Sequence, residues 1–531
     1  MHQSRWGLYL AWVVFMLAAL LPLVQLGGEA FWLNGGIDLG SFLELFSASS
    51  QWALLANSVI LACGASMVAL VIGVPYAVLC EKVHFRGRSF FRLAYLLPLL
   101  IPPYMQAISW GHLLAKNGPI NNFLVEILGL GGSPVSIYSI TGAVFILGLA
   151  YFPFVTLLTM SGLRSIDKQY EEMALSQRSS FHTLSRITLP LVLPHIIAGT
   201  IFVFIFSIID FGVPDILRVK VYPIEIFVQF SAFYNERAAI LLGLPLLAIT
   251  IIMISLQVWV MRGRTYVNFS NGLNGSQANF HFRNKTLAPI FCATVIALAV
   301  IVPVGSLLKM AGPLASYQKG LAASWAQIGF SFTMAVVAAT IMTVIAYVIA
   351  HAMVLSSPKK RTIAEYLTQL PFAIPPILLG LALIKIWNRP MTEWLYGSHL
   401  IIIIGYFAHF IPFTIRVVYA SLQQLNPRFE EMGSILSPSK LRVTSFITVP
   451  MIRKGLLIGF FISFILAFSE LGTTLLVIPP GMSTIPIKIY NFMHYGAESM
   501  VAALCLILLV MQLLFTFGLL SLSRWIKERT A

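Results

Sequence analysis

Long apolar runs recur along the whole 531-residue chain and constrain its fold more than any other feature. A helix needs about 20 consecutive, mostly apolar residues to cross the hydrocarbon core of a bilayer. Hydrophobic residues make up 58% of the chain and charged residues only 10%, whereas soluble domains carry about 25% charged residues. The sequence therefore predicts an all-α polytopic membrane protein with about 12 transmembrane helices, in runs at 7–26, 54–80, 91–114, 138–162, 191–213, 238–261, 287–310, 329–355, 366–387, 399–420, 452–477 and 499–522.

The net charge of +15 follows from membrane topology. If the N-terminus is inside, the inner loops and helix ends hold most of the 34 Lys and Arg residues. The loop 27–53, expected outside, holds none and carries Glu29, Asp38 and Glu44. Inner loops of membrane proteins are enriched in Lys and Arg, so we predict that both termini are cytoplasmic. The basic balance therefore gives no reason to expect a nucleic-acid partner.

Four features recur in the same order in the two halves of the chain. They are a proline-rich stretch inside an apolar run (LPLLIPP at 97–103, LPFAIPP at 370–376), an acid-rich polar loop, a proline that closes this loop (Pro190, Pro450) and a lone carboxylate twenty residues later (Asp210, Glu470). This repetition predicts two homologous six-helix halves, both entering from inside and related by a pseudo-twofold axis along the membrane normal. The predicted domains are a first transmembrane domain at 1–263, a cytoplasmic linker at 264–286 and a second transmembrane domain at 287–531.

Each acid-rich loop is predicted to form a short helix, a turn and a second helix in the cytoplasm. In the second loop, Asn426 can cap a helix that Pro427 begins. In the first loop Ser165 can cap, and paired glutamates follow early in both helices, where the helix dipole favours acids. Two interpretations are open: an amphipathic connector on the bilayer surface, or a pair of matching knobs for a dimeric partner with two grooves. Acids are poorly placed on an anionic leaflet, which favours the second interpretation.

Both loops resemble the EAA loop of the permeases of binding-protein-dependent ABC importers. In that pattern a glutamate is followed by two small residues, a glycine six places on and a proline nineteen places on. The second loop keeps this register from Glu431 to Pro450, with Met432 and Ser437 in place of Ala and Gly. In the first loop the run from the glutamate to the proline is one residue short. The proline-rich third run and the stretch 470–496 also resemble the fused, two-half permeases of ferric-iron importers, and thiamine and aminoethylphosphonate importers have similar permeases.

The resemblance implies a type I ABC importer permease fold and a set of partners. Two cytoplasmic ATPase subunits would dock on the two loops and use ATP, a soluble binding protein would deliver the substrate from outside, and this chain would hold no cofactor. The residues implied in ATPase coupling are Glu171, Glu172, Met173, Ala174, Pro190, Glu430, Glu431, Met432, Gly433, Ser437 and Pro450.

Carboxylates and paired prolines inside apolar runs are the candidates for the translocation path. An acid at the bilayer centre costs roughly 2.5–3.5 kcal/mol, so Asp210 and Glu470 should face a cavity or a partner. One interpretation is a gate that favours a cationic or metal-bearing substrate, and the other is a cap for the following loop. Prolines break backbone hydrogen bonds within spans, either to line a cavity or as packing kinks. The proline candidates are Pro102, Pro103, Pro375 and Pro376.

Other functional classes lack their sequence signatures here. No G-x-x-x-x-G-K-[ST] motif occurs, so the chain has no phosphate-binding loop of its own. No catalytic constellation and no metal-ligand spacing occur, which argues against a membrane enzyme. Cys63, Cys80, Cys292 and Cys505 are predicted to be packing residues in or at the ends of spans. A secondary transporter of the major-facilitator kind remains an alternative, but the loop 81–90 has its basic residues without its acid and glycine arrangement.

Overall fold

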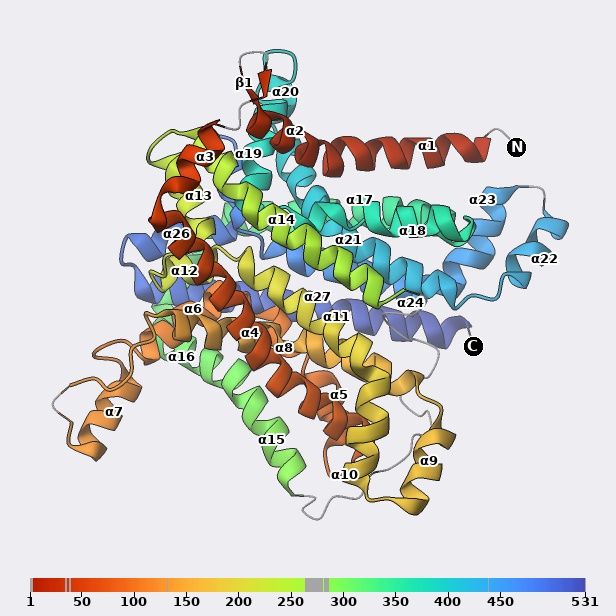
Figure 1. Cartoon of the computed structure of the whole chain (residues 1–531), viewed down its shortest axis with the longest axis horizontal. Helices are drawn as coiled ribbons and strands as arrows, with labels where there is room; N and C mark the ends of the chain where they lie inside the picture. Colours follow the sequence, from red (N-terminus) through yellow and green to blue (C-terminus); the bar gives the residue numbers. More distant parts are fainter. Residues whose placement is uncertain are drawn as a thin grey trace. The chain divides into compact units, whose positions relative to one another are not determined.

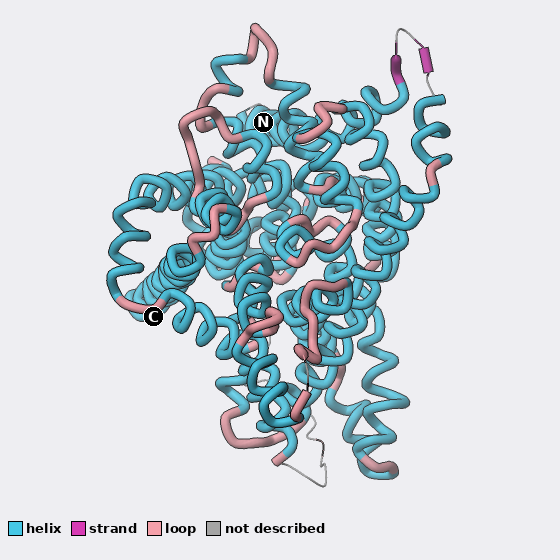
Figure 2. Tube along the Cα trace, turned by 90° about the vertical axis from the view of Figure 1, so that its left-hand side faces the viewer, coloured by secondary structure: helices cyan, strands magenta, loops and turns pink. Residues whose placement is uncertain are grey.

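The structure is a computed structural model that describes residues 3–33, 36–37, 40–130, 132–262, 280, 286–437 and 439–530. The described chain is almost entirely helical, as Figure 2 shows. Its one strand pair joins β1 (Trp32–Leu33) to β2 (Gly36–Ile37) in antiparallel register. The predicted linker at 264–286 lies outside the described residues, apart from positions 280 and 286.

Ten helical segments of the described residues are long and apolar enough to cross a membrane, and a bent pair makes up to eleven. The ten are Trp6–Phe31, Ser49–Lys82, Ile140–Ser165, Ser180–Ile208, Glu236–Val260, Leu287–Ala311, Leu314–Val354, Leu400–Gln423, Leu441–Phe468 and Glu498–Gly518. Each contains most of one predicted run. The other two predicted runs, at 91–114 and 366–387, are broken helices. The predicted all-α polytopic fold of about 12 transmembrane helices is confirmed, and ten of the runs form continuous helices in the part of the chain that the structure describes.

Consecutive prolines cause both breaks. A residue before proline is driven out of the helical region of backbone space. Accordingly Pro102 (φ −51°, ψ 142°) and Pro375 (φ −54°, ψ 139°) are extended, and new helices begin at Pro103 and Pro376. In the second half, Pro358–Ala373 and Pro376–Trp387 meet at 96°. A single proline such as Pro153 leaves its helix continuous.

The described chain divides into two compact units that do not follow the order of the sequence. Unit 2 comprises Leu39–Ser316 with Glu498–Leu506. Its elements, labelled in Figure 1, are α3 (Gly40–Ser47), α4 (Ser49–Lys82), α5 (Arg88–Ala94), the 3₁₀-helix η2 (Leu97–Leu100), α6 (Pro103–Leu113), α7 (Pro119–Leu128), α8 (Ile140–Ser165), α9 (Lys168–Gln177), α10 (Ser180–Thr183), the π-helix η3 (Leu184–Thr188), α11 (Leu189–Ile208), α12 (Gly212–Ile216), α13 (Tyr222–Ser231), α14 (Glu236–Val260), α15 (Leu287–Ile296), η4 (Ala297–Ile301) and α16 (Val302–Ala311).

Helices α4, α8 and α11 form the centre of unit 2. A Cβ at Gly199 on α11 would lie 2.8 Å from the Cα of Val155 on α8, so only glycine allows this approach. Small residues commonly permit such close packing between membrane helices.

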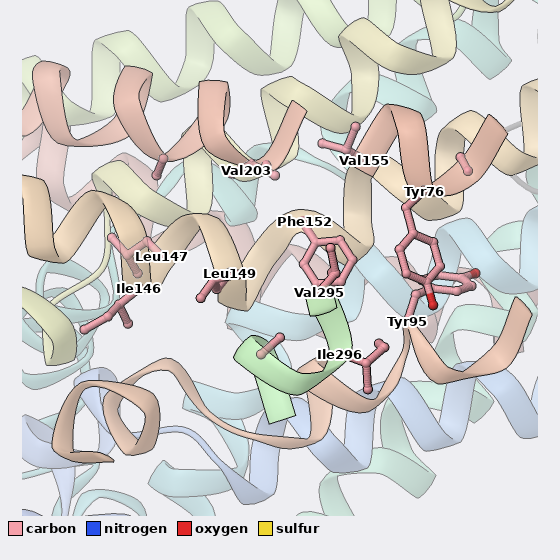
Figure 3. Close-up of a cluster of buried hydrophobic side chains, with 14 of the residues drawn as sticks. Tyr76, Tyr95, Ile146, Leu147, Leu149, Phe152, Val155, Val203, Val295 and Ile296 are labelled. Carbon is pink, nitrogen blue, oxygen red and sulfur yellow. The ribbon is translucent and has the colours of Figure 1, made fainter. Parts of the chain in front are cut away.

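The seventh span, α15 to α16, packs against helices of the first half. Figure 3 shows its Val295 and Ile296 in one buried cluster with Phe152 of α8. The Ser306 hydroxyl donates to the Ser109 carbonyl at 3.1 Å. The buried thiols of Cys80 on α4 and Cys292 on α15 are hydrogen-bonded to each other.

Unit 1 comprises Met1–Asp38, Tyr317–Ala497 and Ile507–Ala531. Its elements are α1 (Gln3–Phe15), the π-helix η1 (Met16–Leu20), α2 (Leu21–Phe31), β1, β2, α17 (Leu314–Val354), α18 (Pro358–Leu367), the 3₁₀-helix η5 (Leu370–Ala373), α19 (Pro376–Trp387), α20 (Glu393–Tyr396), α21 (Leu400–Gln423), α22 (Arg428–Leu436), α23 (Lys440–Val443), the π-helix η6 (Thr444–Thr448), α24 (Val449–Phe468), α25 (Gly472–Val477), α26 (Ile485–His494) and most of α27 (Glu498–Thr530).

In unit 1 the first span of the chain packs on the second half, with η1 against α21 and α2 against α19. Each compact unit thus contains the first span of the other sequence repeat. The boundaries 1–263 and 287–531 describe the repeat in the sequence and stay a prediction. In the compact units the first spans of the two repeats are exchanged, and the sequence repeat alone does not reveal this exchange.

The thiol pair makes the position of the seventh span testable. A protease site is inserted into the linker, and Cys63 and Cys505 are replaced by Ala. Because the Cys80 and Cys292 thiols are in contact, iodine treatment should join them, and the two fragments should remain linked on non-reducing gels after cleavage. A Cys292→Ser variant is the control. Complete separation of the fragments from the oxidised protein would contradict this packing.

Candidate functional site

The first acid-rich loop has the predicted helix–turn–helix form. Its first helix, α9, is capped by Asp167, whose carboxylate accepts from the Gln169 amide at 3.0 Å. The prediction that Ser165 caps was wrong, because its hydroxyl donates back to the Gly162 carbonyl at 2.7 Å inside α8. The second helix, α10, begins after Ser179, which accepts from the His182 amide.

A buried ion pair fixes this loop to the span α4. The Glu171 carboxylate lies 2.6 Å from the Lys82 ammonium, and each side chain is 1% exposed. The other carboxylate oxygen accepts from the Thr188 hydroxyl at 3.0 Å. We call Lys82, Glu171 and Thr188 the first anchor. Glu171 therefore lies inside unit 2, whereas the resemblance implied a docking role for it.

The second loop is built in the same way. Asn426 accepts from the Arg428 amide at 3.1 Å, and α22 runs to Leu436. The N-cap position of α22 is Pro427, with no side-chain cap, so the prediction that Asn426 caps this helix was wrong; its side chain forms the turn that leads into the helix. The next residue, Ser437, is extended and ends the helix. Gly433 is buried, and a Cβ there would collide with Ile447 of η6.

The second anchor consists of His351, Glu430 and Thr448. The His351 Nε2 atom lies 3.2 Å from the Glu430 carboxylate, which also accepts from the Thr448 hydroxyl at 2.6 Å. The acid and the threonine are 18 residues apart here and 17 apart in the first anchor. The first loop is one residue shorter than the second, and this difference therefore falls between the glutamate and the threonine of the anchor.

Apolar side chains on the loops are exposed. In the first loop Met173 is 71% exposed, and Glu172 pairs at the surface with Lys168 at 2.7 Å. In the second loop Met432 is 60% exposed. Their exposed neighbours include Tyr170, Phe181, Phe429, Ile435, Leu441 and Phe446. Of the other predicted coupling residues, Glu431, Pro190 and Pro450 are exposed and Ala174 is half-buried. Figure 1 shows α22 and α23 projecting beyond the end of α24.

Asp210 caps the short helix α12 next to the break in the third span. One carboxylate oxygen accepts from the Val213 amide at 2.9 Å, and the other accepts from the Tyr151 hydroxyl at 3.3 Å. A Cβ at Gly212, the first residue of α12, would lie 3.1 Å from the Cβ of Tyr104. Tyr104 directly follows Pro103, so the carboxylate-capped helix packs on the broken span.

Glu470 has the same role in unit 1. Its two oxygens accept from the backbone amides of Thr473 and Thr474, and the Thr474 hydroxyl also donates to it. The Thr473 hydroxyl donates to the Pro376 carbonyl at 3.2 Å, which ties α25 to the second broken span. Tyr406 lies close to this carboxylate and shares a hydrogen bond with Thr474.

The structure thus brings each predicted carboxylate next to a predicted proline break. Both acids cap the following short helix, as one of the two sequence interpretations held, and a role in transport stays a prediction. Sequence reasoning missed the tyrosine partners. A Tyr-Phe pair in both halves, at 151–152 and 406–407, is the signal that could have found them. Among the described residues, no group of three His, Cys, Asp or Glu side chains is placed to hold a metal ion.

Comparison with known proteins identifies the class. The family described as the inner membrane component of binding-protein-dependent transport systems matches residues 69–267 and 342–529, once in each half. The chain belongs to this family. It is the multi-pass, membrane-spanning permease of such a system, in which ATP is hydrolysed by separate subunits.

Two relatives that match most of this chain are named for ferric-iron transport, and a relative that matches less of it is named for another substrate. The chain is 24% identical to the Fe(3+)-transport system permease protein FbpB 2 of Haemophilus influenzae, over 86% of this chain and 87% of the relative. It is 22% identical to the ferric transport system permease protein FbpB of Actinobacillus pleuropneumoniae, over 87% and 69%. A spermidine/putrescine permease, PotB of H. influenzae, is 27% identical over 39% of this chain and 74% of its own length.

One solved structure, a bacterial alginate ABC transporter in complex with its pentasaccharide-bound periplasmic protein, has a chain that aligns with a TM-score of 0.40 and 18% identity. The alignment covers 49% of this chain and 93% of that chain.

The first anchor predicts a large stability effect at one buried position. Lys82→Met leaves the Glu171 carboxylate buried without its cation, which costs roughly 3–5 kcal/mol when one partner of a buried pair is removed. We therefore expect a clear fall in the thermal unfolding temperature of the purified protein in detergent. The double variant Lys82→Met, Glu171→Gln should recover part of it.

Lys168→Met is the matched control, because it breaks the exposed pair with Glu172 and should change stability by about 1 kcal/mol or less. Equal shifts in unfolding temperature for the Lys82 and Lys168 variants would show that the buried pair stabilises the protein no more than the exposed pair does.

Proposed function

We propose that this chain is the permease of an ATP-driven importer for ferric iron. The observation that supports ferric iron as the substrate is the extent of the similarity, since two relatives matched over most of this chain are named for ferric transport. A relative named for 2-aminoethylphosphonate transport, PhnV, matches only 30% of this chain. Phosphonate and thiamine are therefore the competing substrates to include in an assay.

The two acid-rich loops are the sites where two cytoplasmic ATPase subunits dock. Each loop presents exposed apolar side chains on a short helix, the form that fits a groove on a partner. Each is also fixed to its own set of spans through an anchor, so movement of the docked subunit would reach the spans directly. This assignment requires that both loops and both chain termini are cytoplasmic, in agreement with the distribution of Lys and Arg.

The carboxylate-capped breaks are the candidate gate of the translocation path. Asp210 with Tyr151, and Glu470 with Tyr406, place oxygen atoms beside backbone that the proline pairs have freed from helical hydrogen bonds. Hard multivalent cations prefer oxygen ligands. Irregular backbone at membrane depth is tolerated where it lines a protected cavity. Together these features favour a metal-bearing substrate over a neutral one.

Uptake of radioactive ferric iron, in cells that depend on this chain for it, tests both proposals. We expect uptake with the unaltered chain, and a reduction of about tenfold, equivalent to about 1.4 kcal/mol, when Asp210→Asn and Glu470→Gln are combined. Each amide keeps one acceptor oxygen for the helix cap, removes the charge, and replaces the second acceptor oxygen by an NH2 donor. Glu126→Gln on α7, an exposed carboxylate, is the matched control.

The outcomes separate the two proposals. Normal uptake by the double variant at equal expression would remove the gate role and leave the substrate assignment intact. If the unaltered chain supports no ferric uptake but takes up aminoethylphosphonate or thiamine, the substrate assignment is wrong.

A further inference from the structure

Helix α6 carries two buried side chains whose polar atoms make no hydrogen bond with the described part of the chain. Gln106 is 0% exposed, and neither the nitrogen nor the oxygen of its amide has a partner there. Trp110, one helical turn later, is 5% exposed, and its indole N–H has no acceptor among the same residues. Burial of such groups without a partner costs free energy, so nearly all buried polar groups in proteins are paired. Gln106 and Trp110 therefore require an explanation.

The packing of α6 does not need these polar atoms. The ring of Trp110 packs edge-on against Phe145 of α8, with the ring centroids 5.1 Å apart, and a phenyl ring could make the same kind of contact. The nearby hydroxyl of Ser109 is satisfied within the helix, since it donates to the Met105 carbonyl at 3.0 Å. A polar side chain on this helix can thus be paired locally, which Gln106 and Trp110 are not.

The second copy of the broken span has apolar residues at the same two positions. Gln106 and Trp110 lie three and seven residues after Pro103, and Leu379 and Leu383 lie three and seven residues after Pro376. Both leucines are 0% exposed. The same position after the same break is therefore filled well by leucine, and the polar pair is a feature of the first copy.

The pair lies close to the candidate gate of unit 2. The Gln106 amide donates to the Pro102 carbonyl at 3.3 Å, so Gln106 is in the first turn after the break, and Trp110 follows within about two turns. Tyr104, two residues before Gln106, packs on Gly212 of the helix that Asp210 caps. Extended backbone at Pro102 separates α6 from η2, so α6 can shift as a segment of its own.

We propose that Gln106 and Trp110 form a hydrogen-bonding subsite for the oxygen ligands that ferric iron carries, and that movement of α6 during transport brings them to the substrate. The inference rests on the proposed function, because it takes ferric iron as the substrate. A hard cation keeps oxygen ligands such as water, hydroxide or carboxylate. The amide and indole N–H groups can donate to anionic oxygens, and the amide oxygen can accept from bound water.

The subsite and the gate carboxylate then act on different parts of the substrate. Asp210 attracts the positive charge of the metal, whereas Gln106 and Trp110 recognise the ligands around it. The second copy has leucine at both positions, so the two copies contact the substrate unequally.

Gln106→Leu tests this assignment, because it gives the first copy the residue of the second. The variant removes an unpaired polar group from buried surroundings, so its unfolding temperature in detergent should equal or exceed that of the unaltered chain. Ferric uptake by the complete transporter in proteoliposomes, at a limiting concentration of iron-loaded binding protein, should fall about tenfold or more. Trp110→Phe keeps the ring against Phe145 and removes the N–H, and should lower uptake about threefold to tenfold.

Gln257→Leu on α14 is the matched control. Gln257 is also 0% exposed, but its amide nitrogen donates to the Ala198 carbonyl of α11 at 3.3 Å. Loss of this bond between two spans should lower the unfolding temperature and leave uptake per folded molecule unchanged.

Two results would overturn the inference: normal uptake by Gln106→Leu, or a fall in its unfolding temperature like that of Gln257→Leu, which would make Gln106 a packing residue. Failure of the proposed function has a different signature, because the unaltered transporter would then take up no ferric iron, whereas failure of the subsite leaves that uptake intact.

Discussion

A bilayer offers no water to the polar groups of a chain that crosses it, and the rest of this structure depends on that constraint. Asp210 and Glu470 show how it is met at the spans, and Glu171 and Glu430 show the same need for donors where the loops pack on the spans. Glu171 and Glu430 are satisfied by a cation and a threonine, and Asp210 and Glu470 by the amides of the helices they cap. Each acid is held by donors of its own compact unit, and each holds in place an element that the proposed mechanism needs.

The same constraint connects the loops to the spans. An acid at the start of a cytoplasmic helix costs little in water, but Glu171 is buried and must keep its partner on α4. Separating a buried pair is expensive, so the loop and the span should move together. The anchors join elements together, whereas the proline breaks interrupt helices. The breaks free backbone groups beside the capped helices α12 and α25, and side chains and short helices there supply hydrogen-bond partners for these groups.

Much of the architecture could be predicted from composition and repetition. Apolar runs of sufficient length located the spans, because hydropathy is a local property of the chain. The double proline at 102–103 and at 375–376 identified the two broken spans, and ten continuous apolar helices remain among the described residues. The repeated loops pointed to the family because the order of acid, turn and closing proline recurs in both halves, although the first loop is one residue shorter.

The partners of the key residues could not be predicted. Lys82 and Glu171 are 89 positions apart, and His351 and Glu430 are 79 apart, so no local pattern links them. The exchange of first spans between compact units likewise depends on tertiary packing, which a sequence repeat does not determine. The cap of α9 was misplaced by two residues for a simpler reason: Ser165 and Asp167 both suit the position, and only the last turn of α8 decides between them.

Binding of the purified ATPase subunits to this chain in nanodiscs tests the central claim most directly, namely that two anchored loops on one chain hold two ATP-hydrolysing partners. Met173→Asp and Met432→Asp each place a charge on one loop, and Met391→Asp places it on a still more exposed residue outside the loops. The account predicts that each loop variant weakens binding by about tenfold or more, as loss of a central apolar contact does, while Met391→Asp binds normally. Unchanged binding in both loop variants would contradict it.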